Sequence, residues 1–309
     1  MNNPLVSVII PNYNHAKYLQ QRIDSVLKQT YENYEIIILD DNSTDNSIEI
    51  INRYKTNSHV SHIVINELNS NNPFIQWTKG IEMAKGELIW IAESDDYAST
   101  DFLYILVNQI KKNPNAILAF SHSYFVDSAD CIINIDPHKN SGNSIVVHRG
   151  NVFAKEVLTN GNYIYNASMV IFKRYAYSNI KEKTYQHFRS CGDWLFWMNL
   201  CLQGEVIEVC TKLNYFRQHQ NRVTVKASKT GNDWKEVAVI LSSFINLLNI
   251  EGISLRKFRG KWTNDLLLSN NKDKRYLTQN FNNVFGGSKI DILIYKFSKL
   301  YHKLFGILQ

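Results

Sequence analysis

The sequence predicts an α/β protein with a doubly wound, mostly parallel sheet flanked by helices, followed by a helical C-terminal extension. Short apolar runs alternate with segments of helical spacing through roughly the first hundred residues, which implies parallel strands joined by right-handed crossovers. These runs are nearly continuous rather than alternating, as expected for strands covered on both faces. From about residue 232 onward the spacing is helical throughout.

The expected elements follow one another as strand and helix. Val6–Ile10 is a β-rich run closed by Pro11, and the segment from Tyr18 to Lys28 then places apolar residues at helical spacing. The unit repeats, with a strand at 35–39, a helix at 44–54, a strand at 62–65, a helix at 75–84 and a strand at 87–92. A mixed sheet should continue to about residue 220, with a helix at 100–112, strands at 117–126 and 168–172, and a helix at 193–202.

The N-terminus and the cysteines favour a cytoplasmic protein, free or peripheral on a membrane. Residues 1–4 lack a basic segment, and the apolar run Leu5–Ile10 is too short for a signal peptide. No stretch approaches the roughly 18 apolar residues that a spanning helix needs. The four cysteines form no CxxC pair, so their spacing favours reduced thiols over disulfides, a zinc site or redox chemistry.

The charge distribution favours an anionic ligand or surface. The formal net charge is +6, with Lys and Arg concentrated beyond residue 212 and acidic clusters in roughly the first hundred residues. Basic and aromatic residues do not interleave on a recognisable module, so the pattern argues against nucleic acid as a partner.

Polar residues follow three of the expected strands. They are Pro11–Asn14, Asp40–Ser43 and Glu93–Asp96. In a doubly wound sheet, ligands bind beyond the carboxyl ends of the parallel strands, so these segments should converge on one crevice. The convergence predicts a binding site at that edge of the sheet.

The adjacent carboxylates Asp95 and Asp96 favour a divalent cation, because like charges this close are costly without one. Two aspartates without a neighbouring His or Cys offer the oxygen ligands that Mg²⁺ takes, and substrate phosphate can complete its shell. Asp96 could instead cap the next helix, although Ser99 is the better cap candidate. For Asp40 and Asp41, helix capping and base recognition are equally open, and one aspartate can serve each purpose.

Three motifs occur in order, Val6–Asn14, Leu39–Asp45 and Lys85–Asp96, and together they resemble family 2 glycosyltransferases of the GT-A fold. The resemblance covers about residues 4–220 and includes two later segments, Cys191–Trp194 and Leu213–His219. It implies inverting transfer of a sugar from a nucleotide diphosphate sugar, most readily a UDP-sugar, to a hydroxyl acceptor. The product would be a cell-surface polysaccharide or glycan, and the implied cofactor is Mg²⁺ or Mn²⁺.

The resemblance also implies roles for particular residues. Asp193 matches the general base that takes the acceptor proton, with capping of its own helix as the structural alternative. The implied donor contacts are Pro11, Tyr13, Asp40, Asp41, Lys79, Ser94, Asp95 and Arg217. The implied acceptor contacts are Asn166 and Trp194. The implied metal ligands are Asp95, Asp96 and His219, with Asp96 favoured as the direct ligand. Packing for Tyr13, ion pairing for Arg217 and a core position for His219 are the alternatives.

Two departures from the family pattern affect the donor site. Glu93 stands where many relatives have Asp, which leaves its contact with the donor ribose open. Phe74–Lys79 lies where relatives often show an Arg-Asn pair, and Lys79 is the expected substitute. A flexible ammonium does not reproduce a planar guanidinium, so the identity of the nucleotide is open as well.

Two other functions compete with this interpretation. A nucleotidyltransferase would show a glycine-rich basic loop after the first strand, and Asn12–His15 is not such a loop. A catalytically silent scaffold subunit that binds nucleotide sugars would not need to retain Asp95, Asp96 and Asp193 together.

The resemblance divides the chain into a catalytic domain at 1–225 and a helical extension at 226–309. The nucleotide-sugar half is expected at about 1–98 and the acceptor half at 99–225. Within 288–309, apolar residues recur at three-to-four spacing and lysines fall mostly elsewhere, which predicts a basic amphipathic helix. Such a helix can lie in an anionic membrane interface near a lipid-linked acceptor, whereas packing on protein or in a homodimer explains the same stripe.

Overall fold

The computed structural model describes residues 3–133, 138, 142, 144–219, 232–269 and 274–305. The chain divides into two compact units. The first unit comprises Met1–Arg189 and Phe196–His219, and the second, the helical unit, comprises Ser190–Leu195 and Gln220–Gln309. Residues 190–195, expected within the catalytic domain, therefore group with the helical unit. The expected boundary at 225 and the last residues of the terminal helix, 306–309, lie outside the described residues.

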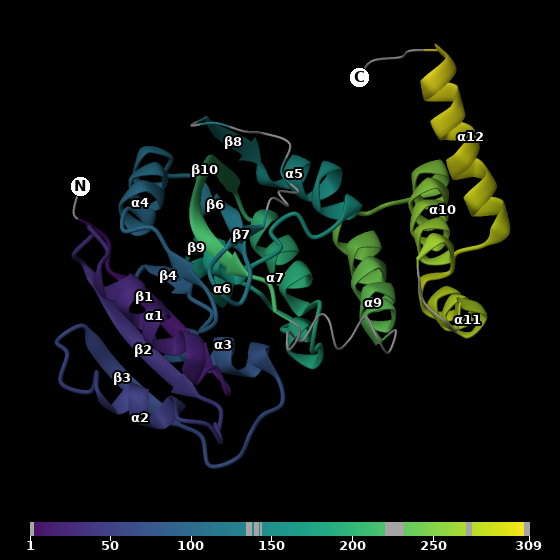
Figure 1. The fold of residues 1–309 in the computed structure, drawn as a ribbon. Coiled ribbons are helices and arrows are strands. Elements are labelled where there is room, and N and C mark those ends of the chain that lie inside the picture. The colour runs from purple at the N-terminus through teal and green to yellow at the C-terminus, as the bar shows by residue number, and fades with distance from the viewer. Residues whose placement is uncertain are drawn as a thin grey trace. The chain divides into compact units, whose positions relative to one another are not determined.

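Within the described residues, the first unit contains one ten-stranded sheet, drawn in Figure 1. Its main path runs through β3 (Val60–Ile65), β2 (Tyr34–Asp40), β1 (Val6–Asn12), β4 (Leu88–Ile91), β9 (Val170–Lys173), β6 (Ala116–Val126), β10 (Glu205–Arg217) and β5 (Tyr97–Ala98). The strands β3, β2, β1 and β4 are parallel, β9 is antiparallel to β4 and β6, and β10 is parallel to β6. The short strands β7 (Ile132–Ile133) and β8 (Ile145–Arg149) pair with β6 and β10.

Helices cover both faces of this sheet, and the predicted fold class is confirmed. The helical elements of the first part of the chain are α1 (Ala16–Leu27), α2 (Ser47–Asn52), α3 (Pro73–Met83), α4 (Phe102–Lys112), α5 (Gly150–Glu156), α6 (Arg174–Ser178) and α7 (Gly192–Cys201), with short 3-10 turns at Leu158–Asn160, Ala167–Met169 and Thr184–His187. Leu19 of α1, Ile51 of α2 and Leu106 of α4 share one core with alternate residues of β1 and β2. On the other face α3 approaches β1 so closely that a Cβ at Gly80 would lie 2.4 Å from Ile9 Cγ2.

The helical unit is built from α9 (Asn232–Leu247), α10 (Gly252–Leu268), α11 (Lys274–Phe285) and α12 (Lys289–Phe305). α10 packs along α12, and α9 packs along α11. The contact between α10 and α12 is close, since a Cβ at Gly260 would lie 2.0 Å from the carbonyl oxygen of Asp291. None of the described helices combines the length and the apolar character that crossing a membrane requires.

A buried carboxylate joins the amino ends of β1 and β2 to the turn before β4. Glu35 Oε1 accepts hydrogen bonds from Ser7 Oγ (2.6 Å) and the Lys85 amide (2.8 Å), and Ser7 Oγ accepts one from the Gly86 amide (2.8 Å). A Cβ at Gly86 would lie 2.6 Å from the Ser7 nitrogen, so only glycine fits there. Burial alone would raise the pKa of Glu35, but these hydrogen bonds outweigh it and hold the pKa below its usual value.

We predict that Glu35→Gln lowers the free energy of unfolding by about 1–2 kcal/mol at pH 7, because hydrogen bonds to an ionised group are stronger than those to an amide. A carboxyl group whose pKa is depressed by folding contributes stability above its unfolded pKa and loses that contribution as pH falls. The difference between the parent and the variant should therefore shrink below the ordinary glutamate value of 4.5. Urea unfolding at several pH values measures it, with the exposed Glu32→Gln as control, and a difference independent of pH would contradict the assignment.

Candidate active site

The loops that follow β1 and β2 are locked together by side-chain hydrogen bonds. Asp40 is fully buried, and its carboxylate accepts from Asn12 Nδ2 (2.7 Å), Ser43 Oγ (2.7 Å) and the Ser43 amide (2.8 Å). Asn14, at a φ of 55°, accepts from the Thr44 amide through Oδ1 (2.7 Å). Asp40 has no exposed surface and braces the two loops, and its contact with a donor stays a prediction.

A third aspartate resolves the capping question that the sequence left open. Asp45 Oδ1 accepts from the Ser47 amide in the first turn of α2 (3.0 Å), and Oδ2 accepts from the Ala16 amide at the start of α1 (2.9 Å). The carboxylates of Asp40 and Asp41 are engaged elsewhere, so helix capping belongs to Asp45.

Asp41 organises the segment between β3 and α3. Its side chain accepts from Asn66 Nδ2 (2.7 Å), the Ser70 amide (3.0 Å), Ser70 Oγ (2.8 Å) and Gln76 Nε2 (2.8 Å). Lys79 Nζ donates to Asn66 Oδ1 (2.6 Å), so one amide links Asp41 to Lys79. The structure thus brings these two predicted donor contacts together, and their contact with a donor stays a prediction.

Tyr13 lies at the same sheet edge as Asp41. Asn12 of β1 pairs with Asp40 of β2, and Tyr13 and Asp41 directly follow the two strands. Its side chain is 47% exposed, which leaves a ring face available to a flat base. Pro11, by contrast, is buried within β1. Of these two predicted donor contacts, only Tyr13 therefore offers an accessible surface.

Asp96 is a buried structural carboxylate. It is 1% exposed, and Oδ1 accepts from the Arg217 amide (2.9 Å) while Oδ2 accepts from Asn166 Nδ2 (2.9 Å) and Ser168 Oγ (2.7 Å). Burial, together with the charge of Asp95, raises its pKa to about 6. Both oxygens already accept protein hydrogen bonds, and the role of Asp96 as the direct metal ligand stays a prediction.

The capping alternative for Asp96 is excluded. The next helix, α4, begins at Phe102 with Asp101 at its N-cap position, and neither Asp101 nor Ser99 supplies a side-chain cap. Asn166, predicted as an acceptor contact, donates to Asp96 and accepts from Asn214 Nδ2 (3.1 Å). Asn166 is 7% exposed and its side-chain amide donates to Asp96, and its contact with an acceptor stays a prediction.

Asp95 points away from this buried network and meets two histidines. Its Oδ2 lies 2.9 Å from His219 Nε2, and one ligand atom each from His15, Asp95 and His219 lie within 4.8 Å of one another. Ser94, 1% exposed, fixes the ring of His15 through a 2.8 Å hydrogen bond between Oγ and Nδ1. Burial alone would raise the pKa of Asp95, but the hydrogen bond from His219 and the charge of both rings hold it below its usual value.

This group has the chemistry of a divalent metal site. It offers one carboxylate oxygen and two imidazole nitrogens, a mixed set that suits a transition ion better than the all-oxygen shell that Mg²⁺ prefers. Asp95 and His219 were predicted from the sequence, whereas His15 was not. The signal for His15 was available, because it directly follows the polar end of the first strand.

Arg22 is a second residue that the sequence analysis missed. It is fully buried, its Nε donates to the carbonyl oxygen of Glu93 (2.8 Å), and its guanidinium lies 4.0 Å from Asp96 Oδ2. Its other two nitrogens have no hydrogen-bond partner among the described residues. Burial lowers its pKa to about 10 despite the attraction of Asp96 and Asp95, so it stays a cation at neutral pH. The sequence did contain a signal for Arg22, because this charged residue falls among the apolar residues on the buried side of α1.

Glu93 is the least acidic carboxyl group of the cluster. Burial, with Asp95 adding to it, raises its pKa to about 8, so the group is largely protonated at neutral pH. Its Oε1 accepts from Trp77 Nε1 (2.8 Å), a residue of α3. The acidic motif thus divides into a protonated Glu93, a braced Asp96 and an accessible Asp95.

Arg217 holds the acidic motif from the other side. Its Nε donates to the Asp95 carbonyl oxygen (2.7 Å), NH1 to the Asp127 carbonyl oxygen (2.9 Å) and NH2 to Gln21 Oε1 (2.8 Å), and NH2 lies 2.7 Å from Asp130 Oδ1. The guanidinium is 1% exposed. Protein groups occupy these guanidinium nitrogens, and the contact of Arg217 with the sugar donor stays a prediction.

Asp193 and Trp194 belong to the helical unit. Asp193 lies in the first turn of α7 and is partly exposed, and its role as general base stays a prediction. Trp194 is 4% exposed and packs against the rings of Phe244 (5.2 Å between centroids) and Trp262 (5.4 Å). Its ring is part of the apolar core of this unit, and its contact with an acceptor stays a prediction.

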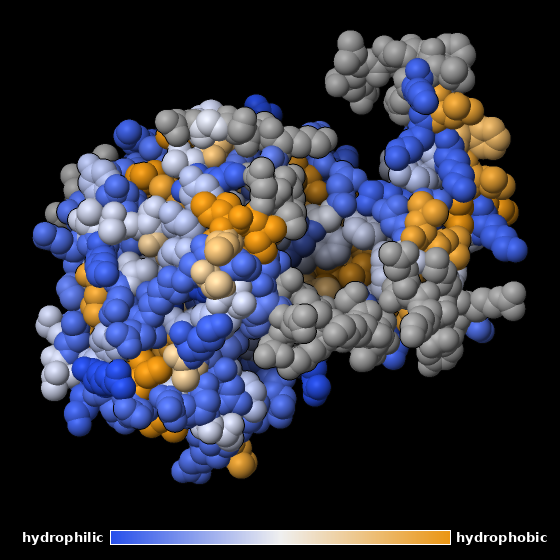
Figure 2. Space-filling view, in the orientation of Figure 1, coloured by the Kyte–Doolittle hydropathy of each residue, from blue (hydrophilic) through white to orange (hydrophobic). Residues whose placement is uncertain are grey.

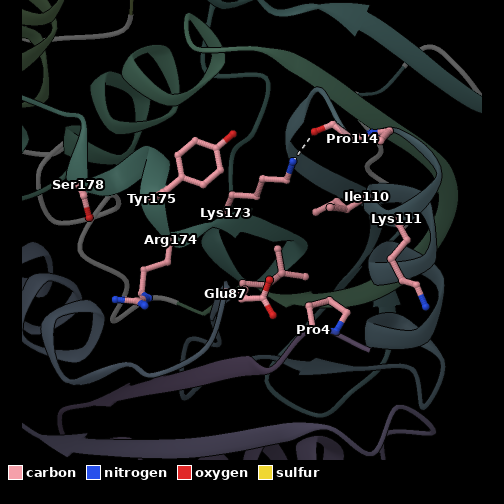
Figure 3. Close-up of a pocket in the computed structure, with 10 residues that line it drawn as sticks. Pro4, Glu87, Ile110, Lys111, Pro114, Lys173, Arg174, Tyr175 and Ser178 are labelled. Carbon is pink, nitrogen blue, oxygen red and sulfur yellow. Dashed lines mark hydrogen bonds between the residues drawn. The ribbon is translucent and has the colours of Figure 1, made fainter. Parts of the chain in front are cut away.

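A cavity of about 670 Å³ lies at the opposite edge of the sheet, at the amino ends of β1 and β4 (Figure 3). Three cations line it, but each already contacts an acceptor: Lys111 Nζ reaches Asn3 Oδ1 (3.0 Å), Lys173 Nζ reaches the Pro114 carbonyl oxygen (2.5 Å), and Arg174 Nε reaches the Gly86 carbonyl oxygen (2.7 Å). The three residues that could hold a metal, His15, Asp95 and His219, and the polar strand ends lie at the carboxyl edge of the sheet. The candidate site is therefore at that edge.

Comparison with known proteins identifies the family of this chain. The sequence pattern of the family described as glycosyl transferase family 2 matches residues 7–187, more than half of the chain. The chain belongs to glycosyltransferase family 2. It is therefore an enzyme that transfers a glycosyl group from a nucleotide sugar, and the nucleotidyltransferase alternative is set aside.

Several bacterial members of family 2 are similar in sequence. An uncharacterized glycosyltransferase of Haemophilus influenzae is 32% identical over 191 residues, which span 62% of this chain and 73% of that protein. The poly(ribitol-phosphate) β-N-acetylglucosaminyltransferase TarP of Staphylococcus aureus is 27% identical over 241 residues, 74% of this chain and 68% of TarP. Glycosyltransferase GlyG of Streptococcus pneumoniae is 36% identical over 126 residues, and the match spans only 41% of its length.

Solved structures share the fold of this family 2 enzyme. Residues 1–349 of S. aureus TarS superpose with a TM-score of 0.67 at 20% identity, covering 91% of this chain and 79% of that one. A mannosyltransferase of Pyrobaculum calidifontis gives a TM-score of 0.52 at 14% identity, covering 99% of this chain and 82% of its own.

We predict that Arg217→Lys lowers the free energy of unfolding by about 2–3 kcal/mol. A single ammonium cannot replace the fork of three hydrogen bonds that the buried guanidinium donates. Arg53→Lys is the matched control, since Arg53 forms an exposed pair with Glu49 and should change stability by less than about 0.5 kcal/mol. Denaturant unfolding measures both variants. Equal effects of the two substitutions would show that the fork does not hold the acidic motif.

Proposed function

We propose that this enzyme transfers a sugar, with inversion, from a nucleotide diphosphate sugar to a hydroxyl acceptor in the synthesis of a cell-surface polysaccharide or glycan. The group formed by His15, Asp95 and His219 carries the proposal. Asp95 follows β4 and Tyr13 follows β1, and these two strands are neighbours, so a metal-bound diphosphate and a base stacked on Tyr13 can belong to one donor. A UDP-sugar is the proposed donor. TarS was solved with UDP-GlcNAc, and TarP is named for N-acetylglucosamine transfer to poly(ribitol phosphate).

Asp95, His219 and His15 are the proposed metal ligands, and a bound divalent ion would neutralise the diphosphate as it leaves. We place Mn²⁺ ahead of Mg²⁺ because two of the three ligand atoms are imidazole nitrogens. The Pyrobaculum mannosyltransferase that shares the fold was solved with GDP-Man and Mn²⁺. Around the ion, Tyr13 would stack on the base, and Asp41 and Lys79 would orient the loop that faces it.

Asp193 is the proposed general base. The acceptor hydroxyl must lose its proton as its oxygen attacks the anomeric carbon, and an ionised carboxylate can take that proton. The first turn of a helix favours the ionised form, which fits the position of Asp193 in α7. With these roles, residues 1–98 would form the donor half, 99–225 the acceptor half and 226–309 the helical extension.

We expect the protein to release nucleoside diphosphate from a UDP-sugar when Mn²⁺ and an acceptor are present, and to stop in EDTA. Asp193→Asn should lower kcat by about 10²-fold or more, because an amide cannot take the proton, and should change donor affinity by less than about threefold. Product release over a panel of nucleotide sugars measures the first effect, and calorimetry measures the second.

The matched control is Asp233→Asn, which changes an aspartate in the first turn of another helix of the same unit. This control should retain activity. Full activity of Asp193→Asn would remove the proposed base. Tight donor binding by the parent protein without turnover on any acceptor would instead support a silent scaffold subunit.

We also propose that α12 holds the enzyme on the anionic cytoplasmic face of a membrane, next to a lipid-linked acceptor. Apolar side chains on one side of α12 are exposed by 51–68%: Ile290, Leu293, Phe297, Leu300 and Tyr301. Figure 2 shows this apolar band along α12. Exposed lysines border it at 289, 296, 299 and 303, so the stripe matches an interface of acyl chains and anionic headgroups.

We predict that the protein sediments with vesicles containing phosphatidylglycerol and much less with pure phosphatidylcholine vesicles, because the lysines add about 1 kcal/mol each near an anionic surface. Phe297→Glu should lower the bound fraction by about tenfold, since it places a charge within the apolar band. Leu68→Glu, at a residue of the first unit that is 82% exposed, is the control. A concentration-dependent dimer that Phe297→Glu dissociates, without vesicle binding, would show instead that the stripe is a homodimer contact.

A further inference from the structure

A second cluster of metal-ligating side chains lies on the sheet, apart from the Asp95 site. Glu208 and Cys210 are two residues apart on β10 and therefore face the same side. The neighbouring strands add His122 from β6 and His148 from β8. His122 Nε2 lies 2.9 Å from Glu208 Oε1, and His148 Nε2 lies 2.9 Å from Glu208 Oε2. One ligand atom each from His122, Glu208 and Cys210 lie within 4.8 Å of one another.

The cluster is buried and carries charge. His122 is 0% exposed, Glu208 1% and Cys210 2%, whereas the side chain of His148 is 25% exposed and lies nearest to solvent. Burial alone would raise the pKa of Glu208, but hydrogen bonds from His122, His148 and the Tyr163 hydroxyl hold it well below the usual range. The buried carboxylate is therefore an anion at neutral pH.

One polar atom of the cluster is not satisfied. His122 Nδ1 is buried and has no hydrogen-bond partner among the described residues. A buried imidazole nitrogen without a partner costs free energy, and such groups in folded proteins mark strain, catalysis or an ion. Nε2 of the same ring already meets Glu208, so an ion bound at Nε2 would replace that hydrogen bond, and an ion bound at Nδ1 would use the nitrogen that has no partner.

We propose that His122, His148, Glu208 and Cys210 form a site for a borderline divalent ion such as Zn²⁺. Thiolate, imidazole and carboxylate are the ligand types that Zn²⁺ combines in four-coordinate sites, at about 2.0–2.3 Å from the metal. The ligand atoms of His122, Glu208 and Cys210 already lie within 4.8 Å of one another, and His148 Nε2, the fourth ligand, lies 2.9 Å from Glu208 Oε2. Binding would release the thiol proton of Cys210 and the proton of any ligating imidazole nitrogen to solvent.

The proposed ion would have a structural role. It would join β8, β10 and β6 at one point, beneath the segment that carries Tyr163. Three residues later that segment supplies Asn166, which holds Asp96. The ion would therefore stabilise the sheet next to the Asp95 site without contacting the sugar donor.

The thiolate makes the site distinguishable by spectroscopy. Metal-free full-length protein, with the Asp95 site removed by Asp95→Asn, is titrated with Co²⁺. We expect one equivalent to produce the near-ultraviolet thiolate-to-cobalt band and the visible bands of tetrahedral Co²⁺, and Zn²⁺ to displace both. The Asp95 group contains no sulfur and cannot give the thiolate band.

The variants locate the ligands. Cys210→Ser should abolish the thiolate band, and Cys201→Ser, which changes a fully buried thiol of α7, should retain it. His148→Gln, at the most exposed ligand, should weaken Zn²⁺ binding by about tenfold or more and serves as the second test if Cys210→Ser does not fold. Excess Zn²⁺ should also raise the melting temperature of the Asp95→Asn protein.

Two outcomes would overturn the proposal. A thiolate band that is absent at stoichiometric Co²⁺, with an unchanged melting temperature in Zn²⁺, would show that the cluster is a hydrogen-bonded network without metal. A band that persists in Cys210→Ser would place the ion at another cysteine.

Discussion

The buried carboxylate of Asp96 is the constraint on which the candidate site depends. It joins the end of β4 to the end of β10 through the Arg217 amide and to the start of β9 through Asn166 and Ser168. An ionised group without exposed surface persists only where donors and a cation surround it, and here Arg22 supplies the cation. Because these elements meet at Asp96, the adjacent Asp95 is turned toward the surface, where it can act on a substrate.

The polar residues at the carboxyl edge separate into those that support the site and those that can act in it. Asp40, Asp96 and Arg217 have their hydrogen-bonding capacity satisfied by protein groups and are buried. Tyr13 and Asp95 retain accessible surface. A substrate contacts groups with exposed area, so the second set is the one that we propose acts in the site, and the first set fixes its geometry.

Irregular pairing of β10 with β6 lets one strand serve both clusters. Glu208 and Asn214 are an even number of residues apart and would face the same side of a regular strand. Register shifts between Val209 and Asn214 place the two side chains on opposite faces instead. Glu208 therefore contacts His122, whereas Asn214 contacts Ser123, the next residue of β6, which faces the other side. One side of the sheet thus supports Asp96, and the other carries the proposed zinc ligands.

The sequence by itself determined the α/β fold, the order of its main elements, the family and the polar strand ends. Each of these features is encoded in a short pattern of neighbouring residues. It did not predict β8 or β10 as strands, because their patterns are short or broken by bulges. Only the tertiary structure decided that Asp95 rather than Asp96 is accessible, that Trp194 is core, and that Cys210 lies beside His122. These properties depend on contacts such as that between Arg217 and Asp96, 121 residues apart, which no local spacing encodes.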